Sequence, residues 1–300
     1  MTRAGSKRRG GRSGGKGDAP DGYRDASRGE RLQRVMADAG IASRRDCERM
    51  IEEGLVEVNG TLVADLPAWV DPKQDRIVVD GKVLPPPARP IYIMLNKPTR
   101  TLTSARDEPG SDRQTVLDLV NYPGSGQLFP VGRLDYETTG LLLLTNDGDL
   151  ANRLTHPRYG VPKLYRAVVK GRVELDAMSA LEDGVKLTDR RDGRTIGASK
   201  TGPVEVDIVH RESDSTVLEV MIREGRNRQV RRMLASLGFP VKKLERIGMG
   251  PLKLKGVQRG FWRELTRIEI GAIRRAAAQA DRASKRGEAG WDPGRKGPGA

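Results

Sequence analysis

Four consecutive leucines, Leu141–Leu144, constrain this 300-residue chain more than any other feature of its sequence. Glycines bound the run at Gly140 and Gly148. A short apolar run between turn residues is typical of a strand that is buried on both faces. We therefore predict a strand inside a folded core, with Asp135 in the loop just before it and Gly132 at the start of that loop.

Asp135 has two interpretations. Aspartates in loops most often cap helices or form turns. A carboxylate at the edge of an apolar sheet can instead be the nucleophile or base of an active site, provided that an arginine keeps it ionised. The stretch 224–234 offers this arginine, because a helix that starts at Asn227 would place Arg228 and Arg231 on one face beside its apolar stripe. An ordinary basic helix with one solvated face would show the same pattern.

Prolines at positions 85, 86, 87 and 90 predict a stiff linker, 85–90, between two folded parts. In the first part, 30–84, we expect a helix over 31–39, a second helix from Ser43 to Gly54 and a hairpin turn at Asn59-Gly60. In the second part, 91–271, strands alternate with helices, so the predicted fold class is α+β with a mixed, mainly antiparallel sheet. Its strands are expected at 91–95, 141–144, 165–169, 204–209, 217–222 and 267–270.

Both ends of the chain are basic and glycine-rich. Residues 1–29 hold eight basic and three acidic groups, and residues 272–300 hold seven and three, within a net charge of +14 for the whole chain. Because these segments have little apolar surface to bury, we predict that both are disordered tails. Basic arms beside a folded domain are typical of proteins that bind a polyanion, most often nucleic acid. Arms that only aid solubility are the alternative.

The sequence also excludes several classes of protein. A single cysteine, Cys47, rules out an internal disulfide framework and a multi-cysteine zinc site, and it indicates a reducing compartment, by default the cytoplasm. Only His156 and His210 are available for histidine chemistry, so we expect no metal site. No apolar stretch is long enough to span a bilayer, and we therefore expect no membrane partner. The oligomeric state stays open, with a monomer favoured.

Arginines three or four residues apart give the first part a basic surface, although a solvated helix face would look alike. The order of elements and residues over 30–80, including Ser43-Arg44-Arg45 and the stretch GLVEVNG at 54–60, resembles the RNA-binding domain of small-subunit ribosomal protein four. The resemblance implies contact with the shape and phosphates of folded RNA. The expected RNA-binding residues are Arg31, Arg34, Arg44, Arg45 and Arg49.

The second part resembles the RsuA/RluB-type pseudouridine synthases. The resemblance rests on GRLDYETTGLLLLTNDG at 132–148, KLY at 163–165 and EGRNRQVRRM at 224–233, in the order of the family's three active-site motifs. With the N-terminal domain it extends over residues 30–271. It implies a catalytic domain that isomerises uridine to pseudouridine in ribosomal RNA without metal or organic cofactor.

The resemblance also implies roles for individual residues. Asp135 corresponds to the essential aspartate, Tyr165 to the aromatic residue that stacks on the flipped uracil, and Arg231 to the arginine that pairs with the aspartate. Arg133 corresponds to the residue that helps hold the target nucleotide out of its helix. Three further residues of the last motif are expected to bind substrate, namely Arg226, Asn227 and Arg228.

One position departs from the family pattern. The early motif Asn-Lys-Pro-x-Gly has Arg100 in place of its glycine, after Asn96-Lys97-Pro98-Thr99. Arginine would be strained there if the backbone needs a positive φ. Lys97 itself is interpreted as a structural residue.

We expect the chain to modify one or very few uridines in ribosomal RNA or a ribosome-assembly intermediate, most simply in the large-subunit RNA, with small-subunit RNA as the alternative. A non-catalytic RNA-binding assembly factor is a second hypothesis, but pure binding would not need Asp135, Tyr165 and Arg231 together. A DNA-associated protein is a third, weakened by the absence of a helix-turn-helix or zinc signature.

Overall fold

The computed structural model describes residues 21–104, 112–123, 127–191 and 194–286. The expected outer tails, 1–20 and 287–300, lie outside these residues. The chain divides into two compact units, residues 1–89 and 90–300, which are treated separately below. No helix in the described ranges combines the length and apolar character needed to cross a membrane.

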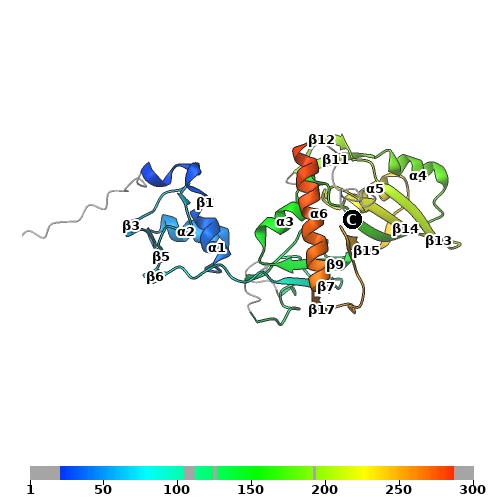
Figure 1. The fold of residues 1–300 in the computed structure, drawn as a ribbon. Coiled ribbons are helices and arrows are strands. Elements are labelled where there is room, and N and C mark those ends of the chain that lie inside the picture. Colours follow the sequence, from blue (N-terminus) through cyan, green and yellow to red (C-terminus); the bar gives the residue numbers. More distant parts are fainter. Residues whose placement is uncertain (1–20, 105–111, 124–126, 192–193, 287–300) are drawn as a thin grey trace, which may run out of the picture. The chain divides into compact units, whose positions relative to one another are not determined.

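Unit 1 is a small α+β domain. Strands β3, β2, β5 and β6 form an antiparallel sheet in that order, and β1 pairs with β4 (Figure 1). Its elements are η1 (Asp21–Tyr23), η2 (Ala26–Arg28), β1 (Glu30–Arg31), α1 (Leu32–Asp38), α2 (Arg44–Glu52), β2 (Val56–Val58), β3 (Thr61–Leu62), β4 (Trp69–Val70), β5 (Ile77–Val79) and β6 (Lys82–Val83).

Local sequence signals account for these elements. The Ser43 hydroxyl accepts a hydrogen bond from the Asp46 backbone N–H at 3.2 Å and caps α2, as predicted. Asn59 and Gly60 have φ values of 55° and 78°, which a two-residue hairpin turn requires, and they join β2 to β3. Apolar side chains of both helices and of β2 and β5 then form one buried core.

Unit 2 is built on a nine-stranded sheet with the order β13-β14-β10-β15-β9-β7-β17, to which β16 and β8 are added at β15 and β9. Every pair is antiparallel except β9 with β15. Its elements are β7 (Tyr92–Lys97), β8 (Phe129–Pro130), β9 (Thr139–Thr145), α3 (Gly148–Thr155), η4 (Pro157–Tyr159), β10 (Lys163–Lys170), α4 (Leu175–Glu182), β11 (Lys186–Arg191), β12 (Arg194–Lys200), β13 (Glu205–Arg211), β14 (Ser215–Ile222), α5 (Gln229–Ser236), β15 (Val241–Met249), β16 (Leu252–Lys253), β17 (Trp262–Glu264) and α6 (Arg267–Lys285).

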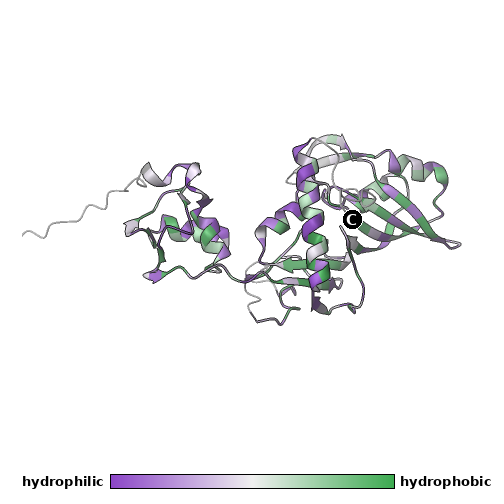
Figure 2. Cartoon of the chain, in the orientation of Figure 1, coloured by the Kyte–Doolittle hydropathy of each residue, from purple (hydrophilic) through white to green (hydrophobic). Residues whose placement is uncertain are grey.

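The leucine run forms the buried strand predicted for it. All seven residues of β9 are buried, and the strand is hydrophobic in Figure 2. Leu141 and Leu143 face a core that includes α3 and α6, whereas Leu142 and Leu144 face a second core on the opposite side. A third core lies between α4 and α5 and the part of the sheet formed by β10, β13, β14 and β15.

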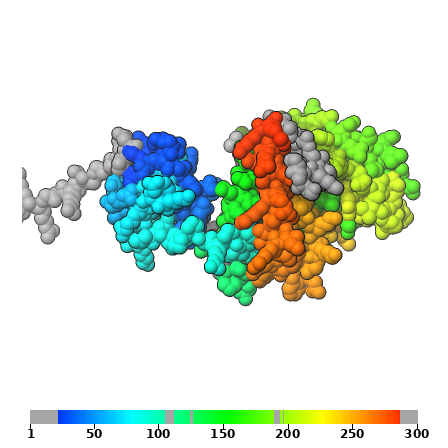
Figure 3. Space-filling model, in the orientation of Figure 1, coloured from blue at the N-terminus to red at the C-terminus, as the bar shows by residue number. Residues whose placement is uncertain are grey.

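The C-terminal predictions were wrong for part of the chain. Residues 267–270, expected as a strand, begin α6, and residues 272–285, expected in a disordered tail, continue it. A capping box between Thr266 and Glu269 starts the helix. Ile273, Ala277 and Ala280 are buried beside α3, and Figure 3 shows α6 in red along the surface of unit 2. Alanines thus supply most of the apolar stripe of α6, and this weak signal was missed because the segment is rich in basic residues.

Residues 21–29, also expected in a tail, fold onto unit 1. Tyr23 is 8% exposed, and its hydroxyl donates a hydrogen bond to the Val58 carbonyl at 3.1 Å. Arg28 forms an ion pair of 3.0 Å with Asp75. One aromatic side chain therefore anchors a segment that has no buried aliphatic residue.

Candidate active site

Asp135 lies in the loop between β8 and β9, as the sequence predicts. Its side chain is 29% exposed. Just after the loop, the second residue of β9 is Gly140, which pairs with Arg246 of β15 and has a φ of +104°. A Cβ at Gly140 would lie 2.3 Å from the Arg246 carbonyl oxygen. Only glycine therefore allows β15 to come this close to β9 immediately behind the Asp135 loop.

Lys97 holds the same loop from inside the protein. Its side chain is fully buried at the end of β7, and its Nζ donates hydrogen bonds to the carbonyls of Pro98 at 2.9 Å and Thr138 at 3.0 Å. Longer bonds reach the carbonyls of Asp135 at 3.2 Å and Tyr136 at 3.4 Å. Burial lowers the pKa of Lys97 to about 8, although the charge of Asp135 opposes this shift. Lys97 therefore fixes the backbone that carries Asp135.

Arg228 is the arginine that contacts the Asp135 carboxylate. Its backbone is left-handed, with a φ of 48°, so α5 begins at Gln229 rather than at Asn227 as predicted. In this conformation the Arg228 Nη1 lies 3.6 Å from Asp135 Oδ2. The Arg228 side chain is 46% exposed, so solvent screens this ion pair.

Arg231, the expected partner of Asp135, is less exposed and binds the backbone. Its Nη2 donates to the Glu137 carbonyl at 3.4 Å and its Nη1 to the Val241 carbonyl at 3.3 Å. Within the described ranges its buried Nε has no partner. Burial and then the charge of Arg228 lower the pKa of Arg231, whereas Asp135 acts in the opposite direction. Arg231 thus influences Asp135 by its charge, while the contact within 4 Å belongs to Arg228.

A cavity of about 640 Å³ collects most of the candidate residues. The loop before β9, the start of β10 and the segment before α5 all contribute to its wall. Tyr165 reaches it from β10, so Asp135 and Tyr165 share one space although they are far apart in the sequence. The candidates on its lining are Arg133, Asp135, Tyr165, Arg226, Asn227 and Arg228. Arg231 lies outside this lining, behind the Asp135 loop.

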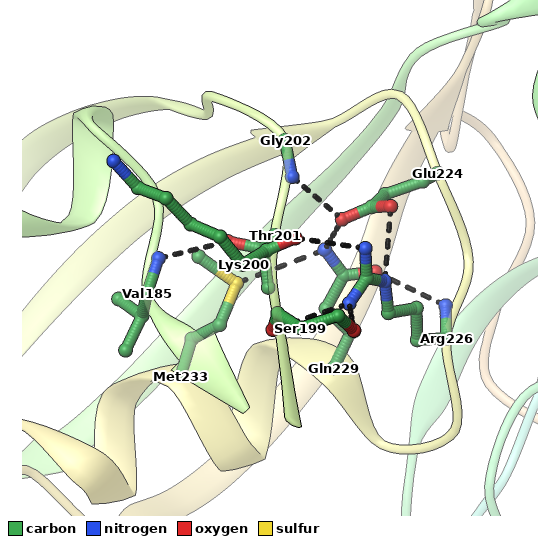
Figure 4. Close-up of polar contacts among 9 residues, drawn as sticks. All are labelled: Val185, Ser199, Lys200, Thr201, Gly202, Glu224, Arg226, Gln229 and Met233. Carbon is green, nitrogen blue, oxygen red and sulfur yellow. Dashed lines mark hydrogen bonds and ion pairs between the residues drawn. The ribbon is translucent and has the colours of Figure 1, made fainter. Parts of the chain in front are cut away.

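Arg226 is engaged by the protein itself. Its Nε donates to Glu224 at 3.1 Å, its Nη1 to the Ser199 hydroxyl at 2.7 Å and its Nη2 to the Lys200 carbonyl at 2.9 Å. Glu224 in turn accepts a hydrogen bond from the Gly202 N–H at 3.0 Å. Figure 4 shows these contacts joining the segment before α5 to β12. Arg226 therefore fastens the β11–β12 hairpin beside the cavity, which it also lines.

Arg100 has the positive φ that would strain an arginine, with a value of 58°. Its N–H donates to the Tyr136 carbonyl at 2.9 Å, so the turn after Lys97 is tied to the Asp135 loop. The glycine of the family pattern suits this backbone better than arginine does. The turn itself is nevertheless formed.

The arginines of unit 1 differ in their partners. Arg34 lies 3.3 Å from Glu30 and 3.4 Å from Asp38, and Arg49 pairs with Asp46. Arg31 lies over the Trp69 ring at 5.4 Å. Arg44 and Arg45 are exposed, and neither forms an ion pair with another residue that the structure describes. The expected RNA-binding set therefore contains two unpaired cations at the start of α2.

Sequence reasoning left three buried cations out of the site residues, namely Lys97, Lys163 and Arg246. Lys163 and Arg246 also line the cavity. A basic residue within an otherwise apolar strand is unusual. The apolar run 91–95 gives this signal for Lys97, whereas β10 and β15 contain other charged residues, so their sequences do not single out Lys163 and Arg246.

Comparison with known protein families gives a match for each of the two units. The model of the family described as RNA pseudouridylate synthase matches residues 91–236, and the S4 domain model matches residues 30–66. An uncharacterized RNA pseudouridine synthase of Aquifex aeolicus is 43% identical and covers 82% of this chain and 94% of its own. Ribosomal large subunit pseudouridine synthase B of Bacillus subtilis is 41% identical, covering 83% of this chain and 97% of its own. A crystal structure of a pseudouridylate synthase, 30% identical, gives a TM-score of 0.57 over 82% of this chain and 100% of its own.

An RNA-binding domain joined to a mixed sheet whose cavity holds a carboxylate, an aromatic ring and arginines defines an RNA-modifying enzyme. Within this class the chain belongs to the RsuA/RluB family of RNA pseudouridine synthases with an N-terminal S4 domain. It is therefore an isomerase that converts uridine to pseudouridine in RNA.

Proposed function

We propose that this chain forms pseudouridine at one or very few positions of large-subunit ribosomal RNA. The observation that carries the choice of substrate is the 41% identity, over 83% of this chain and 97% of the other, to the Bacillus subtilis protein whose name specifies the ribosomal large subunit. The S4 domain supports an RNA substrate that is folded rather than a free nucleoside.

The reaction breaks the bond between uracil N1 and the sugar, turns the base and joins it again through C5. It therefore needs a space that retains the detached base and a carboxylate near the anomeric carbon. The cavity contains Asp135 and Tyr165 on its lining. We assign Asp135 as the catalytic residue, because attack at C1′ and removal of the 2′ proton both require a carboxylate within reach of the sugar. Tyr165 stacks on the flipped uracil.

The arginines around Asp135 have different proposed roles. Arg231 supplies positive charge and ties the Glu137 carbonyl of the Asp135 loop to α5. Arg228 and Asn227 contact the RNA at the mouth of the cavity, where both are exposed, and Arg133 holds the target nucleotide outside its helix. Arg226 positions the β11–β12 hairpin through the contacts to Ser199 and Lys200.

In unit 1, we propose that Arg44 and Arg45 supply most of the phosphate contacts. Both are exposed, and the described hydrogen bonds and ion pairs leave their guanidinium groups available. Arg31, Arg34 and Arg49 already have partners within the protein, so their contribution is smaller. The protein is proposed to act in the cytoplasm as a monomer, on ribosomal RNA or an assembly intermediate.

The test is a map of pseudouridines in both ribosomal RNAs from cells that lack this gene. Cells are complemented with the unaltered protein, with Asp135→Asn or with Asp183→Asn, a matched change at an exposed aspartate at the end of α4. We expect one large-subunit site to disappear and to return with the unaltered protein and Asp183→Asn only.

Three outcomes would contradict the proposal in different ways. A lost site in small-subunit RNA would change the substrate. Restoration by Asp135→Asn would show that this carboxylate is not the catalyst. An unchanged map of both RNAs would exclude ribosomal RNA as the substrate.

A further inference from the structure

Lys163 is a buried cation inside the proposed active site. It begins β10, two residues before Tyr165, and it is 6% exposed. Its side chain lines the same cavity as Asp135 and Tyr165. Because side chains two residues apart in a strand lie on the same face of the sheet, Lys163 and Tyr165 point to one side.

The ammonium group of Lys163 lacks an acceptor among the residues that the structure describes. In the part of the chain that the structure describes, no hydrogen bond or ion pair involves its Nζ. Burial, followed by the nearby charge of Arg246, lowers the pKa of Lys163 to about 8. An unpaired buried ammonium group destabilises the free protein. Such a group at a cavity wall has the properties of a binding site for a negatively charged ligand.

Arg246 adds a second cation beside it. This residue is the cross-strand partner of Tyr165 on β15 and is 2% exposed. Its Nε donates to the Leu141 carbonyl at 2.7 Å, whereas its buried Nη2 has no partner among the described residues. Lys163 and Arg246 therefore flank the ring of Tyr165 along the strand and across the sheet.

The burial of this pair decides which part of the RNA it fits. Phosphate groups are strongly hydrated and match exposed arginines, as at Arg133 and Arg228 on the same cavity. A flipped base is mostly dehydrated, and its carbonyl oxygens accept hydrogen bonds. The base is also the part that stacks on Tyr165, between the two buried cations.

We propose that Lys163, with Arg246 beside it, binds the carbonyl oxygens of the uracil base and stabilises the anion that this base becomes when it leaves the sugar. This inference rests on the proposed function of Asp135 and Tyr165 in the same cavity. It makes Lys163 a further catalytic residue, because its ammonium group would touch the reacting base.

The electron balance of the step explains the need for positive charge. When the C1′–N1 bond breaks, its electron pair leaves with N1 and is shared with O2 and O4, while C1′ either bonds to the Asp135 carboxylate or forms a double bond to C2′ as Asp135 takes the 2′ proton. After the base has turned, an electron pair of the anion forms the C1′–C5 bond, and in the same step the Asp135–C1′ bond breaks or the proton returns to C2′. C5 then passes its proton to water, and N1 gains one from water. Lys163 keeps its proton throughout and acts by hydrogen bonding and charge.

The test measures binding of two free bases to the full chain at pH 7 by ligand-observed NMR. The probes are uracil, which is neutral at this pH, and 5-nitrouracil, which is an anion. We expect the unaltered protein to bind 5-nitrouracil at least about tenfold more tightly than uracil. Lys163→Met should lose this preference, and Lys170→Met, at the exposed opposite end of β10, should keep it.

Several results would overturn the inference. These are an unaltered protein that binds both bases equally, prefers uracil or binds neither, and a Lys163→Met variant that keeps the full preference. If Lys163→Met does not fold, Lys163→Gln replaces it, and the comparison of the two bases on the unaltered protein still decides. These measurements use no ribosomal RNA, so their failure is distinct from a failure of the pseudouridine map.

Discussion

Two buried lysines of unit 2 lie in opposite environments. Lys97, at the end of β7, donates hydrogen bonds to four backbone carbonyls. Lys163, at the start of β10, has no acceptor among the residues described. Both are nearly inaccessible, and burial lowers the pKa of each to about 8. The difference shows that the partners of a buried charge, rather than its burial, separate a structural cation from one that is available to a ligand.

The largest expected effect is a difference in stability between variants of these two lysines. Lys97→Met leaves the carbonyls of the Asp135 loop without a donor, and we expect the free energy of unfolding to fall by at least about 3 kcal/mol. Lys163→Met removes an unpaired buried charge and should leave the free energy of unfolding unchanged or raise it. Denaturant unfolding of unit 2 measures both values. Equal losses in the two variants would show that Lys163 is also structural.

The same contrast applies to the two arginines near Asp135. Arg231 is tied to the backbone and partly buried, so Arg231→Ala should reduce single-turnover rates about 100-fold. Arg228 is 46% exposed, and Arg228→Ala should reduce them less than about tenfold. A larger loss for Arg228 would make its 3.6 Å ion pair the one that matters for catalysis.

The free energy of unfolding should also depend on pH through the titration of Lys163. The pKa of Lys163 is about 8 in the folded protein, against an ordinary value of 10.5 that applies to the unfolded chain. Between these two pH values the unfolded chain therefore binds more protons than the folded protein does. The free energy of unfolding therefore rises with pH across this window, by at most about 1.4 kcal/mol per pH unit for this group. The stability that Lys163 contributes above this window is lost as the pH falls through 8. The rise in unfolding free energy from pH 8 to 10 should be smaller in Lys163→Met than in the unaltered protein. Equal rises would mean that Lys163 does not titrate in this range.

The smallest expected effect concerns the turn that follows Lys97. Arg100→Gly relieves the strain of a φ of 58°, but it also increases the freedom of the unfolded chain. We expect a net gain in unfolding free energy of about 0.5 kcal/mol. The matched change Thr99→Gly, at a neighbouring position without positive φ, should lower stability by a similar amount. A loss at Arg100 as large as that at Thr99 would remove strain as the explanation.

Strong periodic signals predicted most of the fold. The run Leu141–Leu144, the cap at Ser43 and the turn at Asn59-Gly60 depend on local sequence, and the structure confirms each of them. Helix α6 was missed because alanines form its buried stripe within a basic segment. Local sequence therefore predicted the elements whose buried residues are large, and it did not predict the helix whose buried residues are small.

The candidate site was predictable in part of its membership, and its contacts were not predictable from the sequence. The motifs identified Asp135 and Tyr165, which share the cavity. The hydrogen bonds of Arg226 to β12 and the left-handed backbone of Arg228 depend on the tertiary fold. Lys163 was overlooked because the absence of a partner is visible only when the surrounding residues are known.

The close approach of Gly140 to Arg246 also bears on how this domain can change over evolution. The ladder between β15 and β9 is short, pairing Glu245 with Thr139 and Arg246 with Gly140, and it connects the two halves of the sheet. The core under α4 and α5 takes its residues of the nine-stranded sheet from one half alone, whereas the core beside α6 also contains Met249 of β15 and Leu252 of β16, so substitutions there affect both halves. A side chain at Gly140 would separate the halves beside the Asp135 loop. We therefore expect substitutions at this contact between β9 and β15 to be tolerated least, both in natural sequences and in laboratory libraries.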